Sequence, residues 1–210
     1  MFIFTHATQC GWYSKFLEPV VLEINSGPIG ITLDIGTGPG TLPLMLKQVH
    51  PTISIIGIDP DPQMIRLAKK QDKKQQIQWL QQTLQTYAPS KIERPRNIVF
   101  CSMLYLLTEK EIEKQIRQAL HILHKEGQIL VLSPKGDFRI WKAFIYVWQY
   151  PFSWKNYTYF FWKFFVSFRG RFWTRKKYLL KIADKYNLTY ESKIVFQRQA
   201  ILEILKPSNQ

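Results

Sequence analysis

Apolar residues recur along the chain in short runs that alternate with segments of helical spacing. The strand-sized apolar runs cover residues 31–35, 53–58, 77–80, 97–101 and 128–132. Before the last run, Ile112, Ile116, Leu120 and Leu123 recur at intervals of three and four residues, which predicts a helix over 109–123. Strands separated by helices favour a doubly wound parallel sheet with right-handed crossovers. The pattern therefore predicts an α/β fold.

The two ends of the chain add further elements to this alternation. The segment up to Asn25 is expected to form a helix that packs over a ligand mouth, with Trp12, Tyr13, Phe16 and Leu17 on its apolar side. Residues 176–186 have the spacing of an amphipathic helix. They precede two β-rich runs, 188–196 and 200–205, which are joined by three polar residues and predict a hairpin.

A glycine-rich turn follows the first apolar run, whose last residues are Asp34 and Ile35. The turn contains Gly36, Gly38 and Gly40, and a helix-like segment, 41–49, comes directly after it. Glycines permit backbone angles that side chains forbid and leave room for a ligand against the main chain. The second run ends in Asp59, nineteen residues after Gly40, about where a nucleotide-binding fold places its ribose-holding acid.

The spacing of the glycines separates two families of nucleotide-like ligand. A dinucleotide site uses Gly-x-Gly-x-x-Gly to seat a pyrophosphate on a helix N-terminus. Here the turn reads Asp-Ile-Gly-Thr-Gly-Pro-Gly, with a carboxylate before it. That carboxylate suits a ligand with an amino group and repels a pyrophosphate. The turn resembles the first motif of the class I S-adenosylmethionine-dependent methyltransferases.

The resemblance extends over roughly residues 8–135 and the C-terminal tail. Gly-Ile-Asp-Pro-Asp at 57–61 resembles the second motif of this family, and 64–68 the helix after it. Residues 98–107 are similar to the fourth strand and its turn, and 123–132 to the turn into the fifth strand. The resemblance implies a mostly parallel, seven-stranded, Rossmann-like sheet whose last strand is reversed within a C-terminal antiparallel hairpin.

The resemblance also implies a set of cofactor-binding residues for S-adenosylmethionine. Asp34 and the turn from Gly36 through Thr37 and Gly38 to Gly40 should hold the methionine end of the cofactor. Asp59 should bind both ribose hydroxyls, and Pro60 should shape the adenine wall. Gln82 and Thr83 should meet the adenine edge, where family members often have an Asp. Ser102 and Met103 should lie beneath the sulfonium.

Length and cysteine content are consistent with a single cytoplasmic domain over 1–210. We expect residues 1–30 to form a helical cap and 138–174 a lid insertion. Two cysteines make no disulfide framework and indicate a reducing compartment; Cys101, at the end of an apolar run, is expected to be a small buried side chain. A secretory leader and a spanning segment are both absent from the pattern.

The lid segment is strongly aromatic and basic. Eighteen of the 31 aromatic residues lie in 138–173, and 138–183 contains ten Lys or Arg residues and no Asp or Glu, out of a net charge of +14. One interpretation is a helical lid that covers an acceptor, with Tyr13, Trp141, Trp148, Trp162 and Phe165 as its substrate-facing residues. A second is an element at an anionic membrane surface, and a third is a face for nucleic acid.

The sequence says less about the acceptor and its chemistry than about the cofactor site. Methyl transfer from a sulfonium requires alignment of the acceptor and exclusion of water, and for some acceptors a base. Asp137, just past the fifth strand, is the one weak candidate for that base, and the histidines and cysteines have no metal-ligand spacing. Enzymes of this family that modify base amines carry Asn/Asp-Pro-Pro-aromatic after the fourth strand, but this chain has Cys-Ser-Met-Leu-Tyr at 101–105.

These observations lead to three functional hypotheses. The first is a methyltransferase that acts on a small or lipid-like hydrophobic acceptor under the aromatic lid, loosely similar to the quinone methyltransferases. The second is an RNA methyltransferase whose basic segment contacts phosphates. The third is a non-catalytic cofactor-binding domain with a membrane-docking arm. The expected location is cytoplasmic, peripheral at the membrane under the interfacial interpretation.

Overall fold

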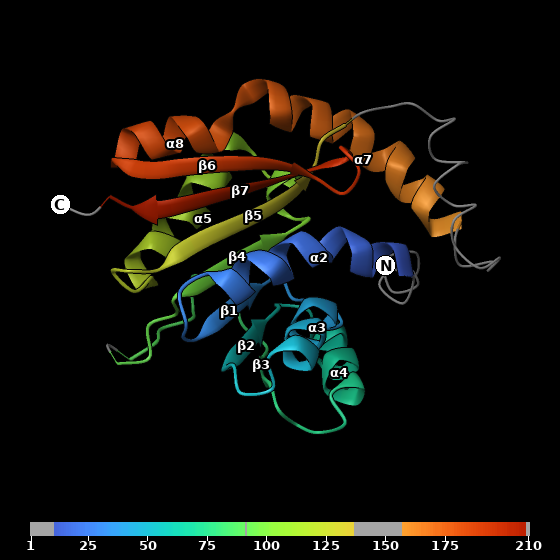
Figure 1. Ribbon diagram of the computed structural model, residues 1–210, viewed down its shortest axis with the longest axis vertical. Helices are drawn as coiled ribbons and strands as arrows, with labels where there is room; N and C mark the ends of the chain where they lie inside the picture. Colours follow the sequence, from blue (N-terminus) through green and yellow to red (C-terminus); the bar gives the residue numbers. More distant parts are fainter. Residues whose placement is uncertain (1–10, 91, 137–156, 209–210) are drawn as a thin grey trace.

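Seven strands form one sheet in the computed structural model, which describes residues 11–90, 92–136 and 157–208 (Figure 1). The order across the sheet is β3-β2-β1-β4-β5-β7-β6. The first five strands run parallel, whereas β7 pairs antiparallel with both β5 and β6. The strands are β1 (Thr32–Ile35), β2 (Ile55–Ile58), β3 (Gln78–Leu80), β4 (Asn97–Cys101), β5 (Gln128–Pro134), β6 (Leu188–Val195) and β7 (Ala200–Pro207). The doubly wound sheet and its C-terminal hairpin are as predicted.

Helices cover both faces of the sheet and are α2 (Gly11–Ser26), α3 (Thr41–Val49), α4 (Pro62–Gln71), α5 (Glu109–Ile122), α7 (Tyr157–Lys176) and α8 (Tyr178–Tyr186). One buried cluster joins the sheet to α2, α3 and α4, and a second joins it to α5 and α8. Neighbouring residues of one strand alternate between them: Val99 belongs to the first cluster and Phe100 to the second. This alternation is the period of two that a strand buried on both faces requires.

Helix α7 contributes to both clusters. Tyr159, Trp162 and Val166 pack with α2 in the first cluster, and Trp173 packs with α8 in the second. Figure 1 shows α7 running along the end of the sheet where β5 stops. Helix α7 therefore connects the two buried clusters at the end of the sheet where β5 stops.

Local sequence accounts for where several helices begin. Thr108 caps α5 by accepting from the Glu111 amide, while the Glu111 carboxylate accepts from the Thr108 amide, so the two residues form a capping box. Asp61 caps α4 by accepting from the Gln63 amide, and Pro62 occupies the first helical position. Both motifs can be recognised in the sequence alone.

The boundary between the last two helices differs from the prediction. The expected helix over 176–186 begins at Tyr178, because Lys176 still belongs to α7. Lys177 separates the two helices with a left-handed backbone, φ +49°. A lysine is no local signal for that conformation, so the break depends on how the helices pack. The predicted lid, 138–174, thus ends inside α7, and its part before residue 157 lies outside the described residues.

The β6–β7 turn adopts an unusual backbone. Phe196, Gln197 and Arg198 all have positive φ, although none is glycine. The turn places the buried Gln199 side chain so that its Oε1 accepts from the Tyr159 hydroxyl at 2.5 Å and from Lys163 Nζ at 2.6 Å. Left-handed residues cost about 1–2 kcal/mol each. The contacts of Gln199 with α7 offset part of this cost and fix the helix to the end of the sheet.

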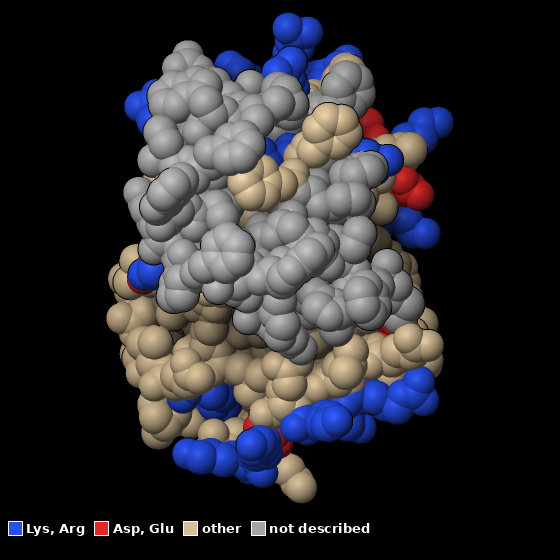
Figure 2. Space-filling view, turned by 90° about the vertical axis from the view of Figure 1, so that its right-hand side faces the viewer, with Lys and Arg blue, Asp and Glu red and all other residues tan. Residues whose placement is uncertain are grey.

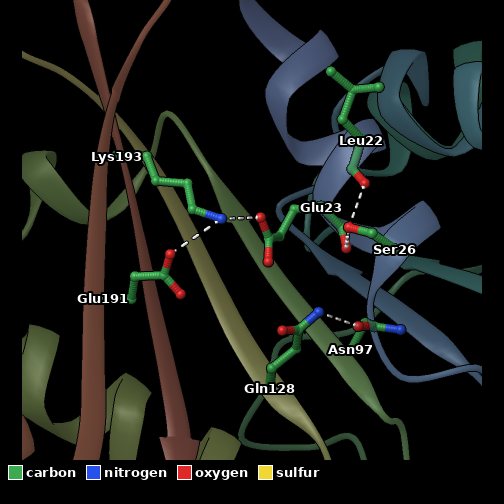
Figure 3. Close-up of polar contacts among 7 residues, drawn as sticks. All are labelled: Leu22, Glu23, Ser26, Asn97, Gln128, Glu191 and Lys193. Atoms are coloured by element: carbon green, nitrogen blue, oxygen red, sulfur yellow. Dashed lines mark hydrogen bonds and ion pairs between the residues drawn. The ribbon is translucent and has the colours of Figure 1, made fainter.

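The C-terminal end of α2 is attached to the sheet by polar contacts (Figure 3). Lys193 of β6 bridges Glu23 of α2 at 2.7 Å and Glu191 of its own strand at 3.2 Å. Deeper in the molecule, Gln128 donates to Asn97 at 2.9 Å, and Asn97 donates to the Pro28 carbonyl just after the helix. These contacts hold α2 across the sheet and so position its N-terminal half at the cavity described next.

Candidate cofactor and acceptor site

A cavity of about 550 Å³ lies at the carboxyl ends of the central parallel strands. Residues from three strand ends, the turns that follow them and the helices α2, α3 and α4 line it: Tyr13, Leu17, Asp34, Gly36, Thr37, Gly38, Pro39, Thr41, Leu42, Asp59, Pro60, Asp61, Met64, Cys101, Ser102, Met103 and Leu106. Open α/β sheets bind ligands at this edge, because the loops that follow the strands diverge there.

The glycines of the turn serve two different purposes. Gly38 has φ +55°, and a Cβ built on it would meet no atom within 4 Å, so it would enter open space. Gly40 has φ +83°, and a Cβ there would lie 2.4 Å from Trp79 Cη2. Gly38 therefore keeps space free at the cavity, whereas Gly40 permits close packing of the turn against β3.

Asp34 is a buried carboxylate at the wall of this cavity. It accepts a hydrogen bond from the Thr37 hydroxyl at 2.7 Å. Burial raises its pKa to about 7; the Thr37 hydrogen bond opposes this rise and the nearby Asp59 charge adds to it. A cationic ligand beside Asp34 would favour its ionised form, because the charge would then have an opposite partner.

Asp59 connects the end of β2 to the glycine turn. Its Oδ2 accepts from the Gly38 amide at 2.9 Å, and its Oδ1 accepts from the Asp61 amide at the same distance. The side chain is only 8% exposed. Two buried acidic side chains, Asp34 and Asp59, thus lie on either side of the glycine turn, and both line the cavity.

The third side of the cavity is mainly apolar. The turn after β4 contributes Cys101 and Met103, and Tyr13 and Leu17 of α2 face them. Burial raises the pKa of the Cys101 thiol, and the Asp34 charge raises it further, so the thiol stays protonated at neutral pH. Cys101 packs against the first buried cluster but is only half-buried, because one side of it faces the cavity.

Aromatic rings support Tyr13 from behind. Trp12 meets Tyr13 edge-on with ring centres 5.5 Å apart and lies 5.4 Å from Trp162 of α7. The Trp12 indole also donates to the Thr158 hydroxyl at 3.2 Å. Phe16 contacts Trp162 and Phe196, which extends the cluster to the β6–β7 turn. Helix α7 thereby sets the position of the α2 residues at the cavity.

The structure brings together most residues that the sequence motifs indicate. Asp34, Gly36, Thr37, Gly38, Asp59, Pro60, Ser102, Met103 and Tyr13 all line the cavity. Gly40 packs behind it. Gln82 and Thr83 follow β3 outside the lining, and Gln82 lines another hollow at the sheet edge.

The structure describes the side chains of only some predicted lid residues. Trp162 is buried in the aromatic cluster and is not among the residues that line the cavity. Asp137, Trp141, Trp148 and the side chain of Phe165 lie outside the described residues. Leu17, on the helix predicted to cover the ligand mouth, and Pro39, within the glycine turn, also line the cavity; lining residues without a predicted role in the site are Thr41, Leu42, Asp61, Met64, Cys101 and Leu106. Several of them are immediate neighbours of motif residues, so their proximity in sequence was the available signal.

The lining is chemically suited to a cationic, nucleoside-like ligand. No Lys, Arg or His side chain is among the described residues that line the cavity, whereas Asp34, Asp59 and Asp61 are. A pyrophosphate would find no cation there, but an ammonium or sulfonium group would find buried carboxylates. The open space at Gly38 gives a ligand access to the backbone of the turn.

Comparison with known proteins points to methyltransferases. Residues 32–127 match the family described as "Methyltransferase domain". A stretch of 71 residues is 38% identical to demethylmenaquinone methyltransferase of Lactobacillus johnsonii (strain CNCM I-12250 / La1 / NCC 533) and covers 34% of this chain. The match spans 28% of that enzyme's length.

Solved methyltransferases share the fold at low identity. The plantazolicin methyltransferase BpumL in complex with SAH has a TM-score of 0.67 and 13% identity, over 97% of this chain and 88% of that one. Magnesium protoporphyrin IX methyltransferase (ChlM) from Synechocystis PCC 6803 with bound SAH has a TM-score of 0.66 and 12% identity, over 94% and 84%.

Residues 32–127 are thus similar to a methyltransferase domain, nearly the whole chain shares the fold of solved methyltransferases, and one of these neighbours has S-adenosylmethionine bound. The lining residues fit this cofactor, because it carries both an ammonium and a sulfonium. Among the described residues, no helix combines the length and apolar character needed to cross a membrane.

Proposed function

We propose that this protein transfers the methyl group of S-adenosylmethionine to a small or lipid-like hydrophobic acceptor. The observation that carries the proposal is that acidic and apolar side chains line one cavity together. We call Asp34, Thr37 and Asp59 its polar end, and Tyr13, Leu17 and Leu106 its apolar end. The polar end would hold the cofactor and the apolar end the acceptor.

The cofactor roles follow from the contacts at the polar end. Asp34 would face the cationic methionine portion, since its buried carboxylate gains an opposite charge there. Asp59, held by the Gly38 and Asp61 amides, would bind the ribose hydroxyls with the remaining lone pairs of its oxygens. Pro60, Asp61 and Met64, which continue from Asp59 around the cavity, would surround the adenine.

When bound, the cofactor supplies an electrophilic methyl group on a positive sulfur. The residues of this chain would align the acceptor with that methyl and keep water away. Tyr13 and Leu17 suit this task, because the aromatic cluster fixes α2 against α7. Burial also raises the pKa of the Tyr13 hydroxyl, so at neutral pH this group would donate a hydrogen bond to an acceptor rather than remove its proton.

The nature of the acceptor is supported by the cavity and by the relatives. No basic side chain among the described lining residues would pair with a phosphate or carboxylate next to the reacting atom. The names of two similar enzymes point to a quinone and to a porphyrin as acceptors.

The exposed rings of Phe164 and Phe172 on α7 support a peripheral location at an anionic membrane, because Arg169 and Arg171 are close to them in sequence.

The direct test is incubation with S-adenosylmethionine labelled in its methyl group and with separated lipid, RNA and small-molecule extracts. We expect label in an organic-soluble product. Label in RNA would instead support an RNA methyltransferase. Cofactor binding without label transfer to any fraction would support a binding domain without catalysis. Gly38→Val is the matched negative control, because it should block the cofactor site.

A further inference from the structure

Helix α4 and the turn that follows it expose a stripe of basic side chains. Arg66, Lys69, Lys70, Lys73 and Lys74 are all exposed. They are spaced three and four residues apart, which places helical residues on one side of a helix. The opposite side of α4 is buried through Ile65 and Ala68. The stripe is therefore a continuous surface on a firmly packed element.

Acidic side chains of the same segment do not neutralise the positive charge of this surface. Asp72 is the one acidic residue in 66–74, and it is buried. Its carboxylate accepts from the Gln76 and Ile77 amides and from the Trp79 indole, so it faces inward. None of the five basic side chains makes an ion pair within the part of the chain that the structure describes. Like charges four residues apart on a helix also repel each other, so the stripe costs stability.

The stripe extends away from the cofactor cavity along α4 to Lys73 and Lys74, which line a second hollow after the helix ends. Asp61 and Met64, at the N-terminal end of α4, line that cavity, and the basic residues begin two positions later. Figure 2 shows Lys and Arg side chains gathered at both ends of this side of the molecule. One end is that of α4 in Figure 1, and the other is that of α7 and α8. Helix α7 exposes Arg171, Arg175 and Lys176.

We propose that the basic stripe of α4 is a docking surface for an anionic lipid bilayer. A flat anionic surface would attract both basic areas, because they lie on the same side of the molecule (Figure 2). A single strand of RNA is disfavoured, because base stacking needs exposed aromatic rings and the described residues of 41–90 expose none; Trp79 and Tyr87 are buried. The proposal concerns attachment and does not depend on which acceptor is methylated.

The test compares two variants with the same loss of charge. The first carries Lys69→Gln, Lys70→Gln, Lys73→Gln and Lys74→Gln. The matched control carries Lys110→Gln, Lys114→Gln, Arg117→Gln and Lys125→Gln, which are exposed on and after α5 at the other face of the sheet. Binding is measured by flotation with vesicles of phosphatidylcholine alone and of an equimolar mixture with phosphatidylglycerol. Calorimetry with S-adenosylmethionine shows whether each variant keeps an intact site.

We expect the unaltered protein to bind the anionic vesicles more tightly than the neutral ones. The α4 variant should bind them at least about tenfold more weakly, because each basic side chain near an anionic surface contributes about a fivefold factor. The control should change about twofold or less, and both variants should bind the cofactor normally.

Three results would overturn the proposal. Equal losses in both variants would show that only net charge matters. Strong vesicle binding that the α4 variant retains would assign attachment to another segment. Binding of the unaltered protein to poly(U) or duplex RNA, but not to vesicles, with loss in the α4 variant, would assign the stripe to nucleic acid. If the unaltered protein bound the vesicles but transferred no methyl group to any acceptor, the proposed function would fail and the docking proposal would stand.

Discussion

The two ends of the cavity are built in different ways. The polar end comes from short stretches of chain at the ends of two adjacent strands, with Asp34 and Thr37 three residues apart and Asp59 two residues from Asp61. The apolar end depends on contacts between distant segments. The indole of Trp12 bonds to Thr158, 146 residues away, and this contact fixes the helix that carries Tyr13.

The two ends of the cavity should therefore respond differently to amino-acid substitutions. A substitution at the polar end should change cofactor affinity directly, because the residues there would contact the ligand. A substitution in the aromatic cluster should act through the packing of α2 on α7, and so on stability and acceptor alignment. The predictions below test that division, from the largest expected effect to the smallest.

Gly38→Val should abolish measurable cofactor binding, with a loss of more than about 3 kcal/mol, or about a hundredfold in affinity. The valine would adopt a backbone with φ +55° that β-branched residues avoid, and its side chain would enter the cavity. Calorimetry with S-adenosylmethionine measures the loss. Gly38→Ala is the milder companion and should retain weak binding. Normal affinity in the valine variant would remove the turn from the site.

Asp59→Ala should weaken cofactor binding by about 1–3 kcal/mol, because buried hydroxyls of the ligand would lose a charged acceptor. The matched control is Asp61→Ala, which removes the cap of α4 and should reduce the free energy of unfolding by about 1 kcal/mol. Its effect on affinity should be smaller than that of Asp59→Ala. If the two variants bound equally well, Asp59 would have no role beyond holding the turn.

The affinity for S-adenosylmethionine should rise about tenfold between pH 6 and pH 8, because ionisation of Asp34 follows a pKa of about 7 and the ligand is cationic. Asp34→Asn should remove this dependence. Stability should change in the opposite direction. The folded protein holds the Asp34 proton more tightly than an unfolded chain with a pKa of 3.8, so the contribution of this group to the free energy of unfolding falls as pH rises from about 4 to about 7. A flat affinity profile in the unaltered protein would contradict the role of Asp34.

The smallest effect is expected at the link between α2 and α7. Trp12→Phe, Thr158→Val and the double variant should reveal a coupling of about 1 kcal/mol in the free energy of unfolding, typical of one buried hydrogen bond. Denaturant titration measures it. Cofactor affinity should stay within about twofold in all three variants. A large loss of affinity instead would show that the two ends of the cavity are not separate.

The sequence by itself determined the elements and the polar end of the site. Alternating apolar runs indicated the parallel strands. The spacing of Ile112, Ile116 and Leu120 indicated α5, and the segment from Asp34 to Gly40 indicated the glycine turn that lines the cavity. These features are local, because strand burial, helix caps and positive φ at glycine leave their signature within a few residues.

Only the tertiary structure decided the rest. The left-handed Lys177 ends α7, and Gln199 holds that helix through Tyr159 and Lys163; neither residue type predicts such a role. The structure also leaves Gln82 outside the cavity and brings Met64 and Leu106 into it. Such outcomes depend on packing between segments that are distant in sequence. Periodicity and motif spacing report which side of an element is buried, but not which partner buries it.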